Sequence, residues 1–259
     1  MSEYGIIIDD MIWSYSRLES YLSCPYKFYL TYIAYPEPRE EEMFYATYGT
    51  FCHDLIKRYY RHEIKADELA GEYLAGYQQN VKGFRPKGSD KWMEQGLEYF
   101  RNFQPLPYEV LAVEQKYDFS VAGYQFTGII DYLGRGKDGE LYIVDNKSAD
   151  IAPRSHRAKP TRKDEELDRR LRQLYLYSIP AAEAYGRMPA GLCFNCFRTK
   201  VFVGNKYEPE AFSKTVKWAV RTIEEIRDAE SFPPRCDYFY CHNICGYMKE
   251  CCYAQEAEW

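Results

Sequence analysis

Residues 1–12 are predicted to be a short lead-in, and apolar positions then recur at helical spacing to about residue 103. Ser16-Arg17-Leu18-Glu19 fits the S-x-x-E capping box, which satisfies free amide groups where a helix begins. Pro25 interrupts this helix, an aromatic-rich helical stretch resumes over 26–32, and the polar, Glu-rich segment 36–42 predicts a loop. Three further helices are predicted at residues 47–60, 66–80 and 90–103.

The period then changes from that of a helix to that of a strand. Alternating apolar residues predict strands at 108–119 and 124–133, and the short apolar run at 141–144 is typical of a buried central strand. A helix at 163–184, one or two strands within 191–203 and a helix at 213–227 complete the order, which predicts an α/β fold. No Pro-, Gly- or Ser-rich linker divides the chain. We therefore expect one domain over 1–259, with a helical part (13–105), a sheet core (106–207) and a C-terminal helix with a cysteine cluster (208–259).

Composition excludes several classes of protein. The 259 residues are 46% hydrophobic and 28% charged, which is close to the average for a soluble globular chain and excludes disorder for the bulk of it. The longest early apolar run, Ile6–Ile8, is too short for a membrane span or a signal sequence, so we expect a cytoplasmic protein with no membrane partner. The net charge of −5 argues against an overall basic surface but leaves room for a local basic groove.

Tyrosine is in excess, with 27 Tyr against 14 Phe and 4 Trp. A tyrosine ring with its polar tip suits half-buried packing, and it also stacks on unpaired bases. Composition alone favours packing, although stacking stays open for Tyr177 and for tyrosines of the N-terminal helices.

Three acidic residues, Glu114, Asp131 and Asp145, lie near strand ends. Alternation along a strand places Asp145 and Lys147 on the same face. Two convergent carboxylates form a hard oxygen site suited to Mg²⁺ or Mn²⁺, and a neighbouring lysine can neutralise charge on a phosphate. Taken singly, each of these acids is more often a solvated strand-end residue.

Several motifs together resemble a known family. Gly128–Asp131 followed by Ile143–Lys147 resembles the PD-(D/E)XK nuclease signature, and more specifically that of the RecB-type exonucleases, including the AddB nuclease and the CRISPR-associated exonucleases. Ser14–Leu30 is similar to the N-terminal helix pair of that subgroup, Gly49–His53 to its G-x-x-x-H element, and Gln173–Tyr177 to its Q-x-x-x-Y element. With the C-terminal cysteines, the resemblance runs in order over residues 14–252.

The resemblance implies a restriction-endonuclease-like core, a mixed β-sheet flanked by helices. It implies an Mg²⁺- or Mn²⁺-dependent deoxyribonuclease, an exonuclease acting on single-stranded DNA in repair, recombination or CRISPR adaptation. Because the chain has no G-x-x-x-x-G-K-[ST] loop, any unwinding would come from a partner such as a helicase. The alternative is a non-catalytic iron–sulfur protein that binds DNA or scaffolds a helicase–nuclease complex.

Roles for individual residues follow from the same resemblance. His53, Asp131 and Asp145 would bind the metal, Glu114 would be a further acid of the site, and Lys147 would be the catalytic lysine. Gln173 and Tyr177 would lie near the substrate, although a core aromatic is an equally good account of Tyr177.

Five of the nine cysteines lie in the last 24 residues. An intracellular chain has little packing reason for this, so the cysteines predict a metal or cluster site, for which zinc is the generic choice. The resemblance implies instead a [4Fe–4S] cluster held by Cys24, Cys241, Cys245 and Cys251. The C-terminal spacing departs from the family's C-x2-C-x5-C, so Cys236 or Cys252 stays open as a replacement. Cys193 and Cys196 face opposite sides of a predicted strand and are expected in the core.

Residues 151–172 hold eight basic and four acidic side chains, a local excess of four positive charges. The segment follows the Lys147 strand and therefore borders the predicted active site. Arg154 and Arg157 are candidate contacts to the DNA backbone. The alternative is a solvated face of mixed charge.

Overall fold

A mixed, five-stranded sheet forms the centre of the molecule, in the strand order β1-β2-β3-β4-β5. The computed structural model describes residues 4–34 and 41–256. All neighbouring strands are antiparallel except β3 and β4. The parallel pair needs a crossover, and helix α7 provides it. The strands are β1 (Glu109–Val121), β2 (Tyr124–Arg135), β3 (Leu141–Asn146), β4 (Gly191–Cys196) and β5 (Val201–Lys206).

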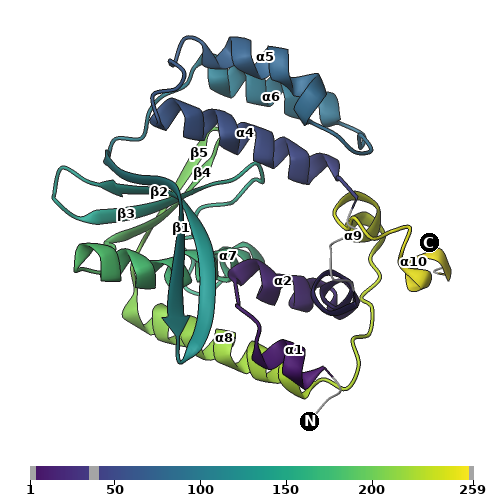
Figure 1. Ribbon diagram of the computed structural model, residues 1–259. Helices are drawn as coiled ribbons and strands as arrows, with labels where there is room; N and C mark the ends of the chain where they lie inside the picture. The colour runs from purple at the N-terminus through teal and green to yellow at the C-terminus, as the bar shows by residue number, and fades with distance from the viewer. Residues whose placement is uncertain (1–3, 35–40, 257–259) are drawn as a thin grey trace.

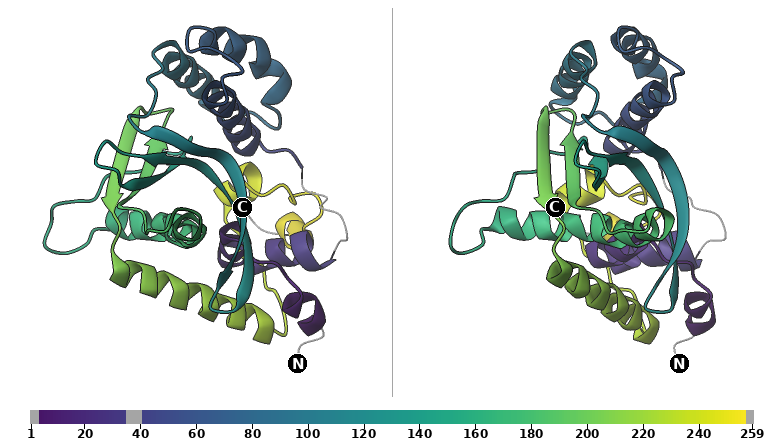
Figure 2. Two further views of the ribbon diagram at one scale, coloured as in Figure 1. Left: turned by 60° about the vertical axis from the view of Figure 1, so that its left-hand side comes forward. Right: turned by 90° about the vertical axis from the view of Figure 1, so that its left-hand side faces the viewer.

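Helices cover both faces of this sheet (Figures 1 and 2). On one face lie α4 (Phe44–Tyr60), α5 (Leu69–Asn80) and α6 (Ser89–Arg101), and on the other lie α7 (Arg162–Tyr185) and α8 (Pro209–Asp228). Because side chains alternate along a strand, neighbouring residues enter different cores. Ile143 packs in the α7–α8 core and Val144 in the α4–α6 core.

The N-terminal and C-terminal regions of the described chain pack against each other beside the sheet (Figure 1). Leu30 of the N-terminal part packs with Cys245 and Tyr247 of the C-terminal part. The N-terminal elements are α1 (Gly5–Asp9), α2 (Tyr15–Ser23), α3 (Pro25–Tyr29) and a π-helical turn (Leu30–Ala34), and the C-terminal ones are α9 (Tyr238–Asn243) and α10 (Cys252–Glu256).

The expected α/β architecture and its element order are confirmed, as is the mixed sheet flanked by helices. The stretch 191–203 forms two strands that extend to residue 206, and helices α4 and α8 begin earlier than predicted. The capping box at Ser16 is wrong. Helix α2 begins at Tyr15, and the Ser14 hydroxyl accepts a hydrogen bond from the Arg17 amide. Most of the loop predicted at 36–42 lies outside the described residues.

Cys193 and Cys196 are buried in the core, as expected. They lie on opposite faces of β4, with Cys193 in the α4–α6 core and Cys196 in the α7–α8 core.

Candidate active site

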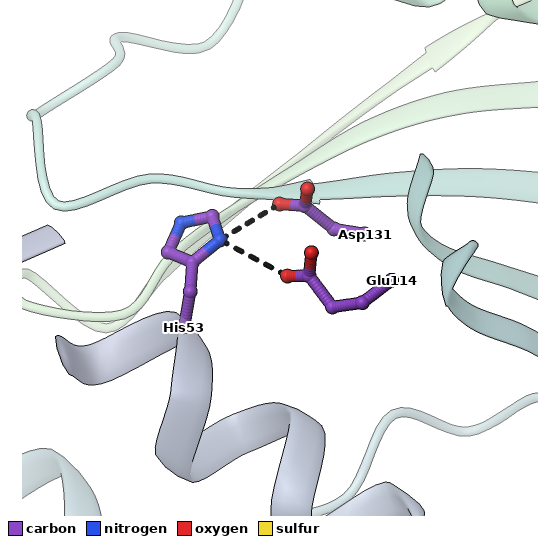
Figure 3. Close-up of side chains that lie close together, drawn as sticks. All are labelled: His53, Glu114 and Asp131. Atoms are coloured by element: carbon purple, nitrogen blue, oxygen red, sulfur yellow. Dashed lines mark hydrogen bonds and ion pairs between the residues drawn. The ribbon is translucent and has the colours of Figure 1, made fainter. Parts of the chain in front are cut away.

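Three side chains from three elements point toward one another (Figure 3). His53 projects from α4, Glu114 from β1 and Asp131 from β2. His53 Nδ1 lies 3.3 Å from Glu114 Oε1 and 3.4 Å from Asp131 Oδ2. The antiparallel register places Glu114 opposite Asp131 across the strand pair. One imidazole nitrogen and two carboxylates lie within 4.8 Å of one another, a donor set that fits a divalent cation.

The prediction that Glu114 lies near a strand end is wrong, because β1 continues through this residue from Glu109 to Val121. Glu114 has a backbone φ of +47° in the middle of this strand. This left-handed conformation is unfavourable for a residue with a side chain and is characteristic of functional sites.

The electrostatics of the cluster also favour a cation. Burial and the nearby Asp145 carboxylate raise the pKa of Asp131 to about 7. Burial alone would lower the pKa of His53, but the Asp131 and Glu114 carboxylates outweigh it and raise that pKa. Like charges crowded in a low dielectric repel one another, and a bound cation would relieve this repulsion.

A second group of polar side chains leads from β3 to α7. Lys147 Nζ lies 2.7 Å from Asp145 Oδ2 and donates to Gln173 Oε1 at 3.2 Å. The Gln173 amide donates in turn to the Tyr177 hydroxyl at 3.3 Å. Burial opposes the charge on Lys147, but Asp145 and Asp131 raise its pKa, so the side chain is an ammonium ion at neutral pH.

The glycine of the Gly128–Asp131 motif has a packing role in this arrangement. A β-carbon on Gly128 would lie 2.4 Å from Tyr177 Cε1, far inside contact distance. Because Gly128 has no side chain, there is room for the Tyr177 ring at this position of β2.

The residues that hold the end of β3 in place are not among those predicted from the sequence. The Asn146 backbone N–H donates to Asp131 Oδ2 at 2.8 Å, and the Asn195 side-chain amide donates to Asn146 Oδ1 at 2.8 Å. Arg198 Nε donates to the Ser148 carbonyl at 2.9 Å, next to Lys147. No local motif marks Asn195 or Arg198, since both come from the β4–β5 region about fifty residues further along the chain.

The basic segment is only partly directed at the site. Arg154 forms an ion pair with Asp168 on α7, and Arg157 is exposed in the loop before that helix. Arg170 pairs with Glu166 at 2.8 Å and lies one helical turn before Gln173, on the same face of α7. The predicted DNA contacts of Arg154 and Arg157 stay predictions.

Five cysteines line one small cavity between the chain ends, namely Cys24, Cys236, Cys241, Cys245 and Cys251. The four predicted cluster ligands are therefore gathered in one place, together with Cys236. Cys236 and Cys252 are both exposed, but Cys252 does not line this cavity. Of the two alternative ligands, Cys236 has the better position.

The tyrosines of the N-terminal helices are half-buried and pack on other rings. Tyr29 stacks on Phe232 at 5.7 Å between ring centroids, and Tyr21 meets Phe28 edge-on at 5.8 Å. Packing therefore accounts for these rings without a nucleic acid.

Among the described residues, no helix has both the length and the apolar character that a membrane span requires.

Known proteins resemble the chain in sequence pattern and in fold. A crystal structure named "Putative exonuclease" from Eubacterium rectale shares the fold, with a TM-score of 0.55 and 10% identity over 96% of this chain and 88% of that one. The crystal structure of SSO0001 aligns with 17% identity over 92% of this chain and 93% of that one, but its TM-score of 0.32 carries no weight. No curated protein matches the sequence. The family model described as the PD-(D/E)XK nuclease superfamily matches residues 12–252, and the chain therefore belongs to that superfamily.

Proposed function

We propose that the protein is a metal-dependent deoxyribonuclease that acts as an exonuclease on single-stranded DNA. The observation that carries the proposal is the cluster of His53, Glu114 and Asp131 beside the ion pair of Lys147 and Asp145. Membership of a nuclease superfamily supports the hydrolytic chemistry. The likeness to the Eubacterium rectale protein, whose name is "Putative exonuclease", is consistent with the mode of action.

His53, Glu114 and Asp131 would hold Mg²⁺ or Mn²⁺, and Asp145 is the further candidate ligand. The bound cation would lower the pKa of water and polarise a phosphoryl oxygen. Lys147 is a hydrogen-bond donor in this site rather than a base, because its neighbouring carboxylates keep it protonated. It can donate to a non-bridging phosphate oxygen and neutralise the charge that develops there. Gln173 keeps the ammonium group in position through its side-chain oxygen.

We propose in addition that the cysteine cavity binds a [4Fe–4S] cluster with a structural role. Four thiolates are the usual ligands of such a cluster, and five cysteines line the cavity. All nine cysteines are free thiols, which suits a reducing compartment such as the cytoplasm. The pathway would be repair, recombination or CRISPR adaptation, with a helicase or an adaptation protein as the partner that supplies single-stranded ends.

The test is anaerobic purification followed by digestion of end-labelled single- and double-stranded DNA with Mg²⁺, Mn²⁺ or EDTA. We expect the wild-type protein to degrade single-stranded DNA with either metal and to be inactive in EDTA. Lys147→Ala and Asp145→Ala should each lower the rate by about 10²-fold or more. The first removes the positive charge beside the reacting phosphate, and the second removes a candidate metal ligand and the ion-pair partner of Lys147. Lys137→Ala, at an exposed turn, is the matched control and should cleave like the wild type.

Undiminished metal-dependent cleavage by Lys147→Ala or Asp145→Ala would show that the mechanism is wrong. A wild-type protein that binds DNA but cleaves none with any divalent metal would favour the non-catalytic alternative. A brown preparation with iron and sulfide supports the cluster. A colourless anaerobic preparation with stoichiometric zinc rejects it.

A further inference from the structure

One face of α4 continues beyond the metal site toward the C-terminal region. Tyr45, Gly49 and His53 are spaced four residues apart and therefore lie on one face of the helix. His53 belongs to the candidate metal site with Glu114 and Asp131. Gly49 faces Ser148, the residue after Lys147, since a β-carbon on Gly49 would lie 3.9 Å from Ser148 Oγ. Tyr45 lies one turn further along the same face, about 12 Å from His53 by the rise of a helix.

Aromatic rings gather around Tyr45. Its ring centroid lies 4.8 Å from that of Trp92 on α6 and 6.1 Å from that of Phe239 on α9. Figure 1 shows α9 beside the first turn of α4. Tyr45 is half-buried, whereas Phe239 is 55% exposed. The Phe239 ring therefore contacts Tyr45 and leaves more than half of its surface open to solvent.

A positive charge joins these rings to the end of β3. The Arg198 guanidinium lies over the Trp92 ring at 4.1 Å from its centroid, and its Nε donates to the Ser148 carbonyl at 2.9 Å. The aromatic group is therefore connected to the residue next to Lys147 by direct contacts. Rings beside a positive charge are the combination that binds unpaired nucleotides, because each base offers a flat face and each phosphate a negative charge.

We propose that Tyr45 and Phe239 form a stacking platform for bases of single-stranded DNA, a few nucleotides from the scissile phosphate. The unpaired strand would run along α4 from the candidate metal site, past Gly49, to α9. The inference rests on the proposed nuclease function and adds to it the place where the unpaired strand is held. A duplex cannot use the platform in this way, because its bases are stacked on one another.

The test measures binding by fluorescence anisotropy of a labelled oligothymidylate, with EDTA present to prevent cleavage. Phe239→Ala should weaken binding of the single strand about tenfold, which is the effect of losing one stacked base. It should leave binding of a duplex of the same length unchanged, and Phe239→Trp should restore the affinity. Phe202→Ala removes a phenylalanine that is 44% exposed on β5, away from α4, and should bind like the wild type.

Phe239 carries the test because an exposed side chain can be removed without loss of the core. Tyr45 packs against Trp92, so Tyr45→Phe, which keeps the ring, is expected to bind normally. Each variant must match the wild type in melting temperature and iron content.

Cleavage assays separate the two proposals. For long single strands, Phe239→Ala should raise KM with little change in kcat, whereas dinucleotide substrates that cannot reach the platform should be cleaved equally by both proteins. If the wild type cleaves DNA and Phe239→Ala binds single strands as the wild type does, the platform is wrong and the nuclease stands. An equal loss of affinity for single strands and for duplexes in Phe239→Ala would also overturn the stacking platform. If the wild type cleaves no DNA, the nuclease proposal fails, whatever the binding result.

Discussion

Gly128 and Tyr177 show how a single residue of a motif can act through packing. The Tyr177 ring occupies the space where a β-carbon of Gly128 would lie. Its hydroxyl accepts from Gln173, whose oxygen in turn accepts from Lys147. The glycine is thus connected to Lys147 through two side chains, which is a physical reason for its place in the motif.

We expect Gly128→Ala to destabilise the protein by about 1–3 kcal/mol, the usual cost of overpacking a filled site. The displaced Tyr177 should also disturb Gln173 and lower the rate of DNA cleavage. Urea unfolding and single-strand digestion measure the two effects. Gly71→Ala on α5 is the control, since a β-carbon there meets nothing within 4 Å and should be neutral or slightly stabilising.

A double-mutant cycle gives a further check on the steric account. Adding Tyr177→Leu to Gly128→Ala removes the ring that the new methyl group meets, so the two changes together should cost less than their sum. Strict additivity would contradict the steric explanation.

At the scale of elements, the start of α7 is held by one carboxylate. Asp164 accepts hydrogen bonds from the amide and hydroxyl of Ser155 at 2.7 and 2.6 Å, and from those of Thr161 at 2.6 and 2.7 Å. Thr161 and Asp164 form the capping box of α7. The same four bonds fix the loop that carries Arg154 and Arg157, so the helix cap also orders the basic segment.

Asp164→Asn should lower the unfolding midpoint at neutral pH and expose residues 151–161 to proteolysis. Hydrogen bonds from Ser155 and Thr161 hold the pKa of Asp164 far below its usual range. A carboxyl group whose pKa is lower in the folded than in the unfolded protein stabilises the fold at pH values above its unfolded-state pKa, which is about 3.9 for aspartate. This contribution is lost as the pH falls through the pKa of the folded state. The difference between wild type and variant should therefore shrink below about pH 4.

Glu165→Gln, in the same turn but exposed, should unfold like the wild type at every pH. A difference between wild type and Asp164→Asn that stays constant down to strongly acidic pH would exclude the carboxylate as its cause.

Elements with a clear period could be predicted from the sequence, and contacts between distant elements could not. The strands at 124–135 and 141–146 carry strong alternation or an apolar run, and they lie within a few residues of their predicted places. The cap of α2 was misplaced because Ser14 and Ser16 are both plausible caps, and the choice depends on how Trp13 bridges to β2. His53, Asp131 and Lys147 belong to motifs and could be found, whereas Arg198 and Asn195 depend on tertiary packing.

At the scale of the whole molecule, the cysteine cavity joins the two ends of the chain. Cys24 lies between α2 and α3, and the other lining cysteines lie in the C-terminal region after α8. The proposed cluster would link Cys24 to Cys241 and so close a loop of more than two hundred residues. By the chain-entropy estimate for a covalent cross-link, closing such a loop stabilises the fold by about 5 kcal/mol.

Cys24→Ala should therefore lose the proposed iron and have a lower melting temperature than the wild type. Its N-terminal helices should become susceptible to proteolysis, whereas the sheet core should stay folded and keep the far-ultraviolet circular dichroism signal. Cys252→Ser, which alters a thiol outside the cavity, is the matched control and should keep both iron and stability.

Cys236→Ser and Cys251→Ser identify the remaining ligand, because only the true ligand should reproduce the loss of iron seen for Cys24→Ala. Full iron content in Cys24→Ala would place all four ligands in the C-terminal region. The cluster would then stabilise that region alone, and the melting temperature of Cys24→Ala should stay close to that of the wild type.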